Sequence, residues 1–156
     1  MKIIVLSDSH GAVSKMETAI ELEKPDCIIF LGDRVADFLL ICDNYPGIPL
    51  FVVAGNCDKT GCPTGFSEKI ITEISGVRFY ITHGHNEHVK TGYMNLIYKA
   101  FESEASIALF GHTHLSCKNR FSDLELLNPG SIGSGSYGIV ILENDKQPET
   151  FVKSIY

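Results

Sequence analysis

The sequence predicts an α/β fold in which two mixed β-sheets lie face to face and helices flank them, a four-layer αββα sandwich. In the first third of the chain, short apolar runs alternate with stretches of helical spacing. Further along, apolar runs come in pairs that are separated by tight turns. Strands joined through helices pair in parallel and strands joined by tight turns pair antiparallel, so both sheets are expected to be mixed.

The first third is predicted to form a parallel sheet with helices. Strands are predicted at residues 2–7, 27–31 and 50–54, and helices at 13–24 and 36–44. Ser14, followed by Glu17 three residues later, predicts a capping box near the start of the first helix, which Pro25 ends. Because the strands are continuously apolar, we expect them to be buried on both faces under helices.

The remainder is predicted to be richer in antiparallel pairs. Hairpins are predicted at 69–74 with 77–82 and at 117–121 with 124–127, a helix at 92–103, and further strands at 106–110, 137–142 and 150–155. The turns Ser75-Gly76 and Ser122-Asp123 lie between the strands of the two hairpins. No repeat, linker or low-complexity segment interrupts the pattern, so residues 1–156 are predicted to form one domain.

The chain carries no sign of export or of a membrane segment. Its N-terminal apolar run is four residues long, too short for a signal peptide, and no run approaches the roughly 20 residues of a membrane span. Five cysteines are present, at positions 27, 42, 57, 62 and 117. An odd number without an export signal predicts reduced thiols in a cytoplasmic protein. Cys27 and Cys42 lie in apolar stretches and are predicted to be buried.

The charge of the chain limits its partners. Thirteen basic and nineteen acidic residues give a net charge of −6, and the basic residues are scattered. Long nucleic acids require a basic stripe, so stable binding to nucleic acid is not expected. A small anionic ligand remains compatible with this composition if the charge is reversed locally. The sequence leaves a homo-oligomer open.

Polar residues of one chemical kind follow the predicted core strands. Five strand ends carry Asp, Asn or His: Asp8-Ser9-His10, Gly32-Asp33, Gly55-Asn56-Cys57-Asp58, Thr82-His83-Gly84-His85 and Gly111-His112-Thr113-His114. Sites in α/β sheets form at the carboxyl ends of strands. One such motif alone is common in turns, but five together indicate a site. Imidazole, carboxylate and amide oxygen suit Mn, Fe, Zn or Co.

The spacing within these turns carries a geometric prediction. Asp8 and His10 are two residues apart, as are His112 and His114. In extended chain, residues i and i+2 point to the same side, so each pair is predicted to converge if its strand continues into the turn. Glycines at 32, 55, 84 and 111 would allow tight turns and close approach of the backbone.

In their order along the chain, these motifs resemble the calcineurin-like metallophosphoesterases. The runs Gly55-Asn56-Cys57-Asp58, Thr82-His83-Gly84-His85 and Asn128-Pro129-Gly130-Ser131 are similar to the small bacterial and archaeal phosphodiesterase branch of that superfamily. The resemblance covers essentially the whole chain.

The resemblance implies two divalent transition-metal ions, Mn first, with Fe, Zn, Ni or Co as alternatives. Asp8, His10 and His114 would bind one ion, Asn56, His83 and His112 the other, and Asp33 would bridge them. His85 would lie beside them and orient a ligand or water, so the implied catalytic residues are His85, Asp33 and Asn56. The implied reaction is hydrolysis of small phosphodiesters by a hydroxide that bridges the two ions.

Two positions beside these motifs left alternatives open. Many relatives carry a His where this chain has Cys57, so the group that protonates the leaving group is not assigned. Arg34 follows Asp33 directly and would contact either phosphate or a neighbouring carboxylate.

A glycine-rich motif matches a nucleotide-binding pattern but is not followed by the helix that nucleotide binding requires. Gly133-Ser134-Gly135-Ser136-Tyr137-Gly138 matches the dinucleotide pattern G-x-G-x-x-G, yet a strand and not a helix is predicted to follow it. It is therefore predicted to be a loop that lines the cleft with Asn128 and Ser131.

Two other functions fit the same fold. One is a retromer-type scaffold, in which the metal site has decayed and the surface binds partner proteins. The other is a phosphomonoesterase or nucleotidase that uses the same site. All seven implied ligand positions are intact here, which favours an enzyme over the scaffold.

Overall fold

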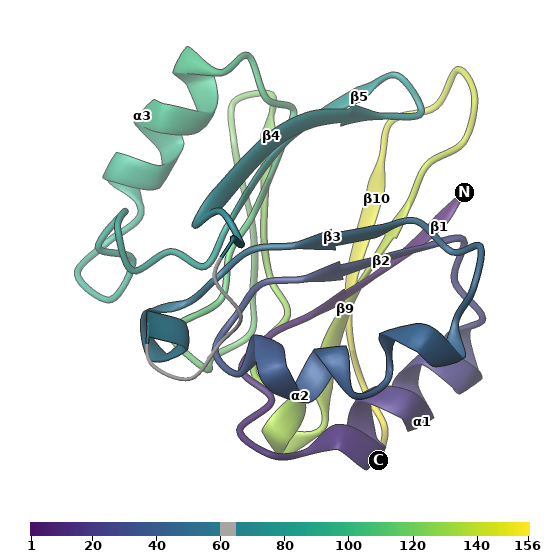
Figure 1. Cartoon of the computed structure of the whole chain (residues 1–156). Coiled ribbons are helices and arrows are strands. Elements are labelled where there is room, and N and C mark those ends of the chain that lie inside the picture. The colour runs from purple at the N-terminus through teal and green to yellow at the C-terminus, as the bar shows by residue number, and fades with distance from the viewer. Residues whose placement is uncertain (60–64) are drawn as a thin grey trace.

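The computed structural model describes residues 1–59 and 65–156, and Cys62 lies outside these ranges. Two five-stranded sheets pack face to face, and helices cover both outer faces (Figure 1). The predicted αββα sandwich is confirmed. Within the described part of the chain, no helix combines the length and the apolar character that crossing a bilayer requires.

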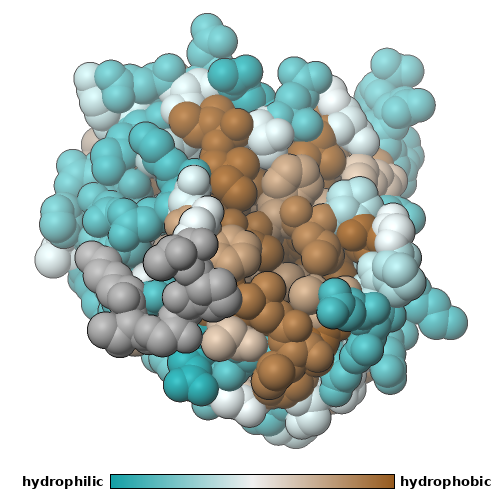
Figure 2. All heavy atoms as spheres, viewed as in Figure 1, coloured by the Kyte–Doolittle hydropathy of each residue, from teal (hydrophilic) through white to brown (hydrophobic). Residues whose placement is uncertain are grey.

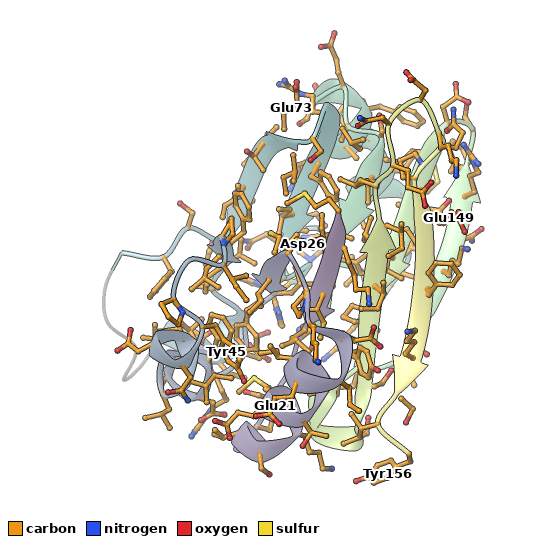
Figure 3. The ribbon with its side chains drawn as sticks, turned by 90° about the vertical axis from the view of Figure 1, so that its right-hand side faces the viewer. Glu21, Asp26, Tyr45, Glu73, Glu149 and Tyr156 are labelled. Atoms are coloured by element: carbon orange, nitrogen blue, oxygen red, sulfur yellow. The ribbon has the colours of Figure 1, made fainter. Side chains whose placement is uncertain are left out.

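The first sheet has the strand order β10-β9-β1-β2-β3. Its strands are β1 (Lys2–Leu6), β2 (Cys27–Phe30), β3 (Leu50–Val52), β9 (Ser136–Ile141) and β10 (Glu149–Ser154). As predicted, β1, β2 and β3 are parallel. The last two strands of the chain add to the other edge of β1 in antiparallel register, side by side in Figure 3.

The second sheet has the strand order β4-β5-β6-β8-β7. Its strands are β4 (Lys69–Ile74), β5 (Val77–Thr82), β6 (Ile107–Leu109), β7 (Cys117–Phe121) and β8 (Leu124–Asn128). The two predicted hairpins, β4 with β5 and β7 with β8, are antiparallel, whereas β5, β6 and β8 run parallel. Both sheets are therefore mixed.

Side chains alternate between the two faces of each strand, so the apolar residues form three layers of core. On β1, Ile3 and Val5 point between the sheets, and Ile4 and Leu6 point toward the helices of the first sheet. Those helices are α1 (Val13–Glu23) and the short α2 (Val35–Leu39). On the second sheet, Tyr80 and neighbouring apolar side chains point outward and pack under α3 (Met94–Glu102).

Several local predictions are corrected. The helix predicted at 36–44 is α2 followed by a separate 3-10 turn at Cys42–Asn44. The capping box is wrong, because α1 begins after Ala12, and no side chain caps it. Ser14 lies inside the first turn, where its carbonyl accepts a hydrogen bond from Thr18 Oγ1.

The burial predictions for β3 and the cysteines are partly corrected. β3 is not buried on both faces, because it is an edge strand and leaves Leu50 38% exposed. Cys27 is fully buried as predicted, whereas Cys42 is only partly buried.

The two sheet edges at β3 and β4 lie on the same side of the molecule. The space-filling view shows a band of apolar surface across this side (Figure 2). On β4, Ile71 is 40% exposed, comparable to Leu50 on β3. Among residues 1–59 and 65–156, no further strand pairs with either edge.

Candidate metal centre

The carboxyl ends of the parallel strands of both sheets meet at one end of the sandwich. Within the first sheet, the Asp8 amide donates to the carbonyl of Gly32 at 3.0 Å. Within the second, the Gly111 amide donates to the carbonyl of His83 at 2.9 Å. His83 Nδ1 lies 2.7 Å from the carbonyl oxygen of Leu31 and so connects the two sheets. The turns that carry the predicted site residues are therefore neighbours.

A first group of converging ligand atoms comes from Asp8, His10, Asp33 and His114, whose ligand atoms all lie within 4.8 Å of one another. His114 Nε2 lies 3.2 Å from Asp8 Oδ1 and 3.2 Å from His10 Nε2. The two carboxylates are buried and the two histidines are exposed. The group thus opens to solvent on its histidine side.

A second group comes from Asp33, His83 and His112, whose ligand atoms also lie within 4.8 Å of one another. The ring of His83 is fully buried, and its Nε2 lies 3.4 Å from Asp33 Oδ1. Because the Leu31 carbonyl can only accept, His83 Nδ1 carries a proton, and Nε2 is the ring nitrogen that faces Asp33. Asp33 belongs to both groups, as the resemblance implies for a bridging residue.

The other two predicted residues lie beside these groups. Asn56 begins the 3-10 turn η2 (Asn56–Lys59) after β3, and its Nδ2 lies 3.5 Å from Cys57 Sγ. The ring centroid of His85 lies 5.5 Å from that of His83 and 6.2 Å from that of His112. Asn56 as a ligand and His85 as a catalytic group remain predictions, as do the other metal assignments.

The geometric reason given for the pairs Asp8/His10 and His112/His114 is wrong. All four residues have φ between +42° and +68°, the left-handed region and not the extended one. Asp33 shares this conformation, with φ of +57°. The side chains therefore converge through sharp turns and not through continuation of the strands. Such strained residues cluster at functional sites.

Gly111 provides the space that the Asp8 carboxylate occupies. A Cβ at position 111 would lie 2.0 Å from Ser7 Oγ and 2.8 Å from Asp8 Oδ2. Asp8 Oδ2 accepts hydrogen bonds from Ser7 Oγ at 2.5 Å and from the His112 amide at 3.1 Å. One oxygen of Asp8 is thus held by the protein, and the other, Oδ1, faces the histidines.

The protonation states suit metal binding. Burial alone would raise the pKa of Asp33, but the nearness of the His83 ring, with its Nε2 3.4 Å from Asp33 Oδ1, and the hydrogen bond from the Cys57 amide hold that pKa well below its ordinary value. Burial, together with the charges of His83 and Lys90, lowers the pKa of His112 to about 4. At neutral pH Asp33 is ionised and His112 is neutral, the forms that bind metal.

The buried polar atoms also fit a cation. Asp8 Oδ1 and His83 Nε2 are buried without a hydrogen-bond partner among the described residues. Such atoms are rare in folded proteins and are costly unless something satisfies them. Both aim at the groups described above, and their oxygen and imidazole chemistry suits borderline divalent metals. The residues present therefore fit one or two such ions.

Buried polar side chains hold the ligand-bearing turns in place, and no sequence motif pointed to Asp37 or Glu87 among them. Four such side chains hold these turns: Asp37, Asp58, Glu87 and Asn128. Asp37 accepts from Ser9 Oγ and the Gly11 amide, and so fixes the turn of Asp8 and His10. Asp37 is a polar residue among the apolar residues of a predicted helix, and this position could have indicated a buried structural role.

Arg34 and Cys57 take definite places beside the site. Arg34 Nη2 lies 3.3 Å from Asp37 Oδ1. Of the two predicted contacts of Arg34, phosphate or a neighbouring carboxylate, the structure therefore shows the carboxylate. Cys57 is exposed, and its amide donates to Asp33 Oδ1 at 2.9 Å.

A strand and not a helix follows the glycine-rich turn, as predicted, but β9 begins at Ser136, so only the first half of the predicted loop is a loop. Within this segment, the 3-10 turn Ile132–Ser134 is capped by Ser131, whose Oγ accepts from the Gly133 amide. Ser131 Oγ also donates to the Asp8 carbonyl at 2.7 Å. The segment thus braces a ligand-bearing turn of the site.

A family model for the calcineurin-like phosphoesterase superfamily domain matches residues 1–147. The chain belongs to this family. Its motifs and its fold agree with that membership, so it is a metallophosphoesterase by family.

Curated relatives and solved structures of the family cover the chain almost completely. The "Probable metallophosphoesterase YsnB" of Bacillus subtilis is 30% identical over 154 residues, which is 93% of this chain and 86% of that protein. The "Phosphodiesterase MJ0936" of Methanocaldococcus jannaschii is 27% identical over 167 residues, 94% and 95% of the two chains. A solved structure from Streptococcus pneumoniae, described as a predicted phosphoesterase, has a TM-score of 0.75 at 27% identity and covers 97% of each chain.

Solved structures named Vps29 share the fold at lower identity. Vps29 from Entamoeba histolytica, solved in complex with Zn²⁺, has a TM-score of 0.71 at 16% identity and covers 99% of each chain. At this identity the likeness shows the fold alone.

Proposed function

We propose that this metallophosphoesterase is a phosphodiesterase, one domain over residues 1–156, that hydrolyses small phosphodiesters with good leaving groups. The observation that carries the proposal is that two groups of ligand atoms share Asp33. A paired site of this kind suits in-line displacement at phosphorus. The relative from Methanocaldococcus jannaschii named as a phosphodiesterase adds support.

In the proposal, Asp8, His10, Asp33 and His114 hold one divalent ion, and Asp33, Asn56, His83 and His112 hold the other, with Mn²⁺ as the first candidate. Such ions supply Lewis acidity, which activates water and neutralises the charge that develops on the phosphoryl oxygens. The protein fixes the ligands beforehand. Burial of Asp8 and Asp33 excludes bulk water from the carboxylate side of the site.

His85 is the proposed residue for proton transfer or for orienting the substrate. Its side chain is 10% exposed, and both ring nitrogens are buried without a hydrogen-bond partner in the part of the chain that the structure describes. Glu68 Oε1 lies 3.4 Å from His85 Nε2 and would orient the ring. Beside them lies a cleft of about 370 Å³, lined by Ser67, Glu68, Lys69, Asn86, Glu87 and Lys99.

Two alternatives remain as outcomes of a test. A scaffold on this fold would lack turnover, and a monoesterase would hydrolyse only monoesters. Because a Vps29 structure holds Zn²⁺, metal binding alone does not separate an enzyme from other members of this fold. Turnover is therefore the deciding measurement.

The experiment is a panel of nitrophenyl phosphodiesters and monoesters, assayed with Mn, Ni, Co, Zn and Mg after treatment with a chelator. We expect diesters to react faster than monoesters and Asp33→Ala to lose both ions and turnover. Hydrolysis of monoesters alone would show a monoesterase. No hydrolysis by fully metallated protein would favour the scaffold.

A further inference from the structure

Asp58 accepts four backbone hydrogen bonds with one buried carboxylate. Oδ2 accepts from the amides of Asp33 at 2.9 Å and Gly55 at 2.7 Å. Oδ1 accepts from the amides of Arg34 and Val35, both at 2.8 Å. A carboxylate offers about four lone-pair sites, so this set of donors fills them. Asp58 is accordingly absent from both groups of metal-ligand atoms.

The segment that Asp58 binds adopts a conformation that is costly by itself. Asp33 and Arg34 are consecutive non-glycine residues in the left-handed region, with φ of +57° and +81°. Left-handed conformations in such residues persist only when the surroundings hold them in place. Hydrogen bonds to an ionised carboxylate are among the stronger ones available to backbone amides. Asp58 thus supplies the contacts that this turn requires.

The same short element also fixes the Asp33 side chain. Asp58 and Cys57 both lie in η2, and the Cys57 amide donates to Asp33 Oδ1 at 2.9 Å. The amide of Gly55, which precedes Asn56, donates to Asp58 as well. One carboxylate therefore connects the turn of Asp33 to the turn of Asn56.

We propose that Asp58 is a positioning residue, which sets the orientation of Asp33 for both metal groups through backbone amides and is not itself a ligand. The inference rests on the proposed function, because it takes the two groups as sites for ions. It predicts that loss of Asp58 weakens binding of both ions, since Asp33 serves both.

The test is Asp58→Asn in the full chain. The amide group of Asn would place N–H donors against backbone N–H donors and lose about half of the acceptors. Metal-free protein is titrated with Mn²⁺, and free Mn²⁺ is followed by electron paramagnetic resonance. We expect two ions in the wild type and a loss of affinity of roughly 10–100-fold in Asp58→Asn, the usual effect of removing a residue that orients metal ligands.

Glu23→Gln is the matched control. Glu23 is also a buried carboxylate, and it accepts hydrogen bonds from Tyr137 and Lys153 on the first sheet, outside the metal groups. We expect Glu23→Gln to lose stability and to keep wild-type affinity for Mn²⁺. If it lost affinity as Asp58→Asn does, the effect would be one of general stability, and the inference would be wrong.

The remaining outcomes separate the two proposals. Two ions in the wild type with unchanged affinity in Asp58→Asn would overturn the role of Asp58 and leave the proposed function standing. A wild type that binds no Mn²⁺, Zn²⁺ or Co²⁺ would overturn both. If Asp58→Asn does not fold, amide hydrogen exchange in the wild type decides: slow exchange at Arg34 and Val35 supports the contact, and fast exchange refutes it.

Discussion

The backbone of Gly55 and the carboxylate of Asp33 are in such close contact that no side chain fits between them. A Cβ on Gly55 would lie 2.2 Å from Asp33 Oδ1 and 2.6 Å from the Asp33 amide nitrogen. Contacts under 3.0 Å essentially never occur for a real Cβ, so one of the two turns would have to move. The glycine after β3 thus determines where the carboxylate shared by the two metal groups lies.

We therefore expect Gly55→Ala to weaken binding of both ions, by roughly 10–100-fold, because it displaces the carboxylate that both groups share. Titration with Mn²⁺ measures the effect. Gly76→Ala is the control, because Gly76 has φ of +78° in the hairpin turn between β4 and β5, and a Cβ there would meet no other described residue within 4 Å. It should cost stability and leave metal affinity intact. Wild-type affinity in Gly55→Ala would contradict the prediction.

Asn128→Ala tests the turn that carries two predicted ligands. Asn128 Nδ2 donates to the Gly111 carbonyl at 2.9 Å and to Thr113 Oγ1 at 3.0 Å, on either side of His112. Because His112 and His114 belong to different groups, we expect affinity for both ions to fall. Asn119→Ala, on the exposed strand β7, is the matched control and should bind as the wild type does. Loss of one ion alone would show that the turn does not move as a unit.

Glu23 should make the stability of the wild type depend on pH, and Glu23→Gln should remove that contribution. Burial alone would raise the pKa of Glu23, but hydrogen bonds from Lys153, Tyr137 and Lys2 outweigh it and lower that pKa below its ordinary value of 4.5. A lowered pKa stabilises the folded state above the unfolded pKa, and the benefit is lost as the pH falls through the folded value. At pH 7 we expect the wild type to be more stable by about 1–3 kcal/mol.

The measurement is urea unfolding of metal-free wild type and Glu23→Gln between pH 7 and pH 3. The difference in the free energy of unfolding should be largest at neutral pH and should shrink below about 4.5, the ordinary pKa of the carboxyl. A difference that stays constant over this range would show that the charge of Glu23 is not what stabilises the fold.

Cys57→Ala should retain most activity on nitrophenyl diesters, with a loss of less than about tenfold. Help from a general acid is typically worth about 10²–10⁴-fold, and good leaving groups do not need it. The contact between Cys57 and Asp33 uses the backbone amide, which the substitution preserves. A large loss on every substrate, with metal content intact, would assign the thiol a catalytic role.

The dependence of rate on leaving-group pKa extends this test. We expect a steep dependence for the wild type, because this chain has Cys57 where the family resemblance implies a histidine. Cys57→His should flatten it by helping poor leaving groups most. A leaving-group series on the wild type and both variants decides, and an unchanged slope in Cys57→His would refute the argument.

The sequence by itself determined the order of elements and which turns carry the polar residues. The apolar residues 3–6 of β1 are followed within four residues by Asp8 and His10, and this adjacency required no knowledge of the fold. The direction of pairing between strands that follow one another also came from local sequence, because helical connections give parallel pairs and tight turns give antiparallel pairs. These features depend on near neighbours in the chain.

Only the tertiary structure decided how the side chains converge. The left-handed conformations at Asp8, Asp33 and His112 run against the preference of isolated residues, so no local pattern predicts them. They persist because distant groups hold them, as Asp58 holds Asp33 across 25 residues. The capping box at Ser14 was wrong for the same reason, because contacts of Asp37 with Ser9 and Gly11 fix the chain before α1. Conformations that tertiary hydrogen bonds stabilise leave no signal in local sequence.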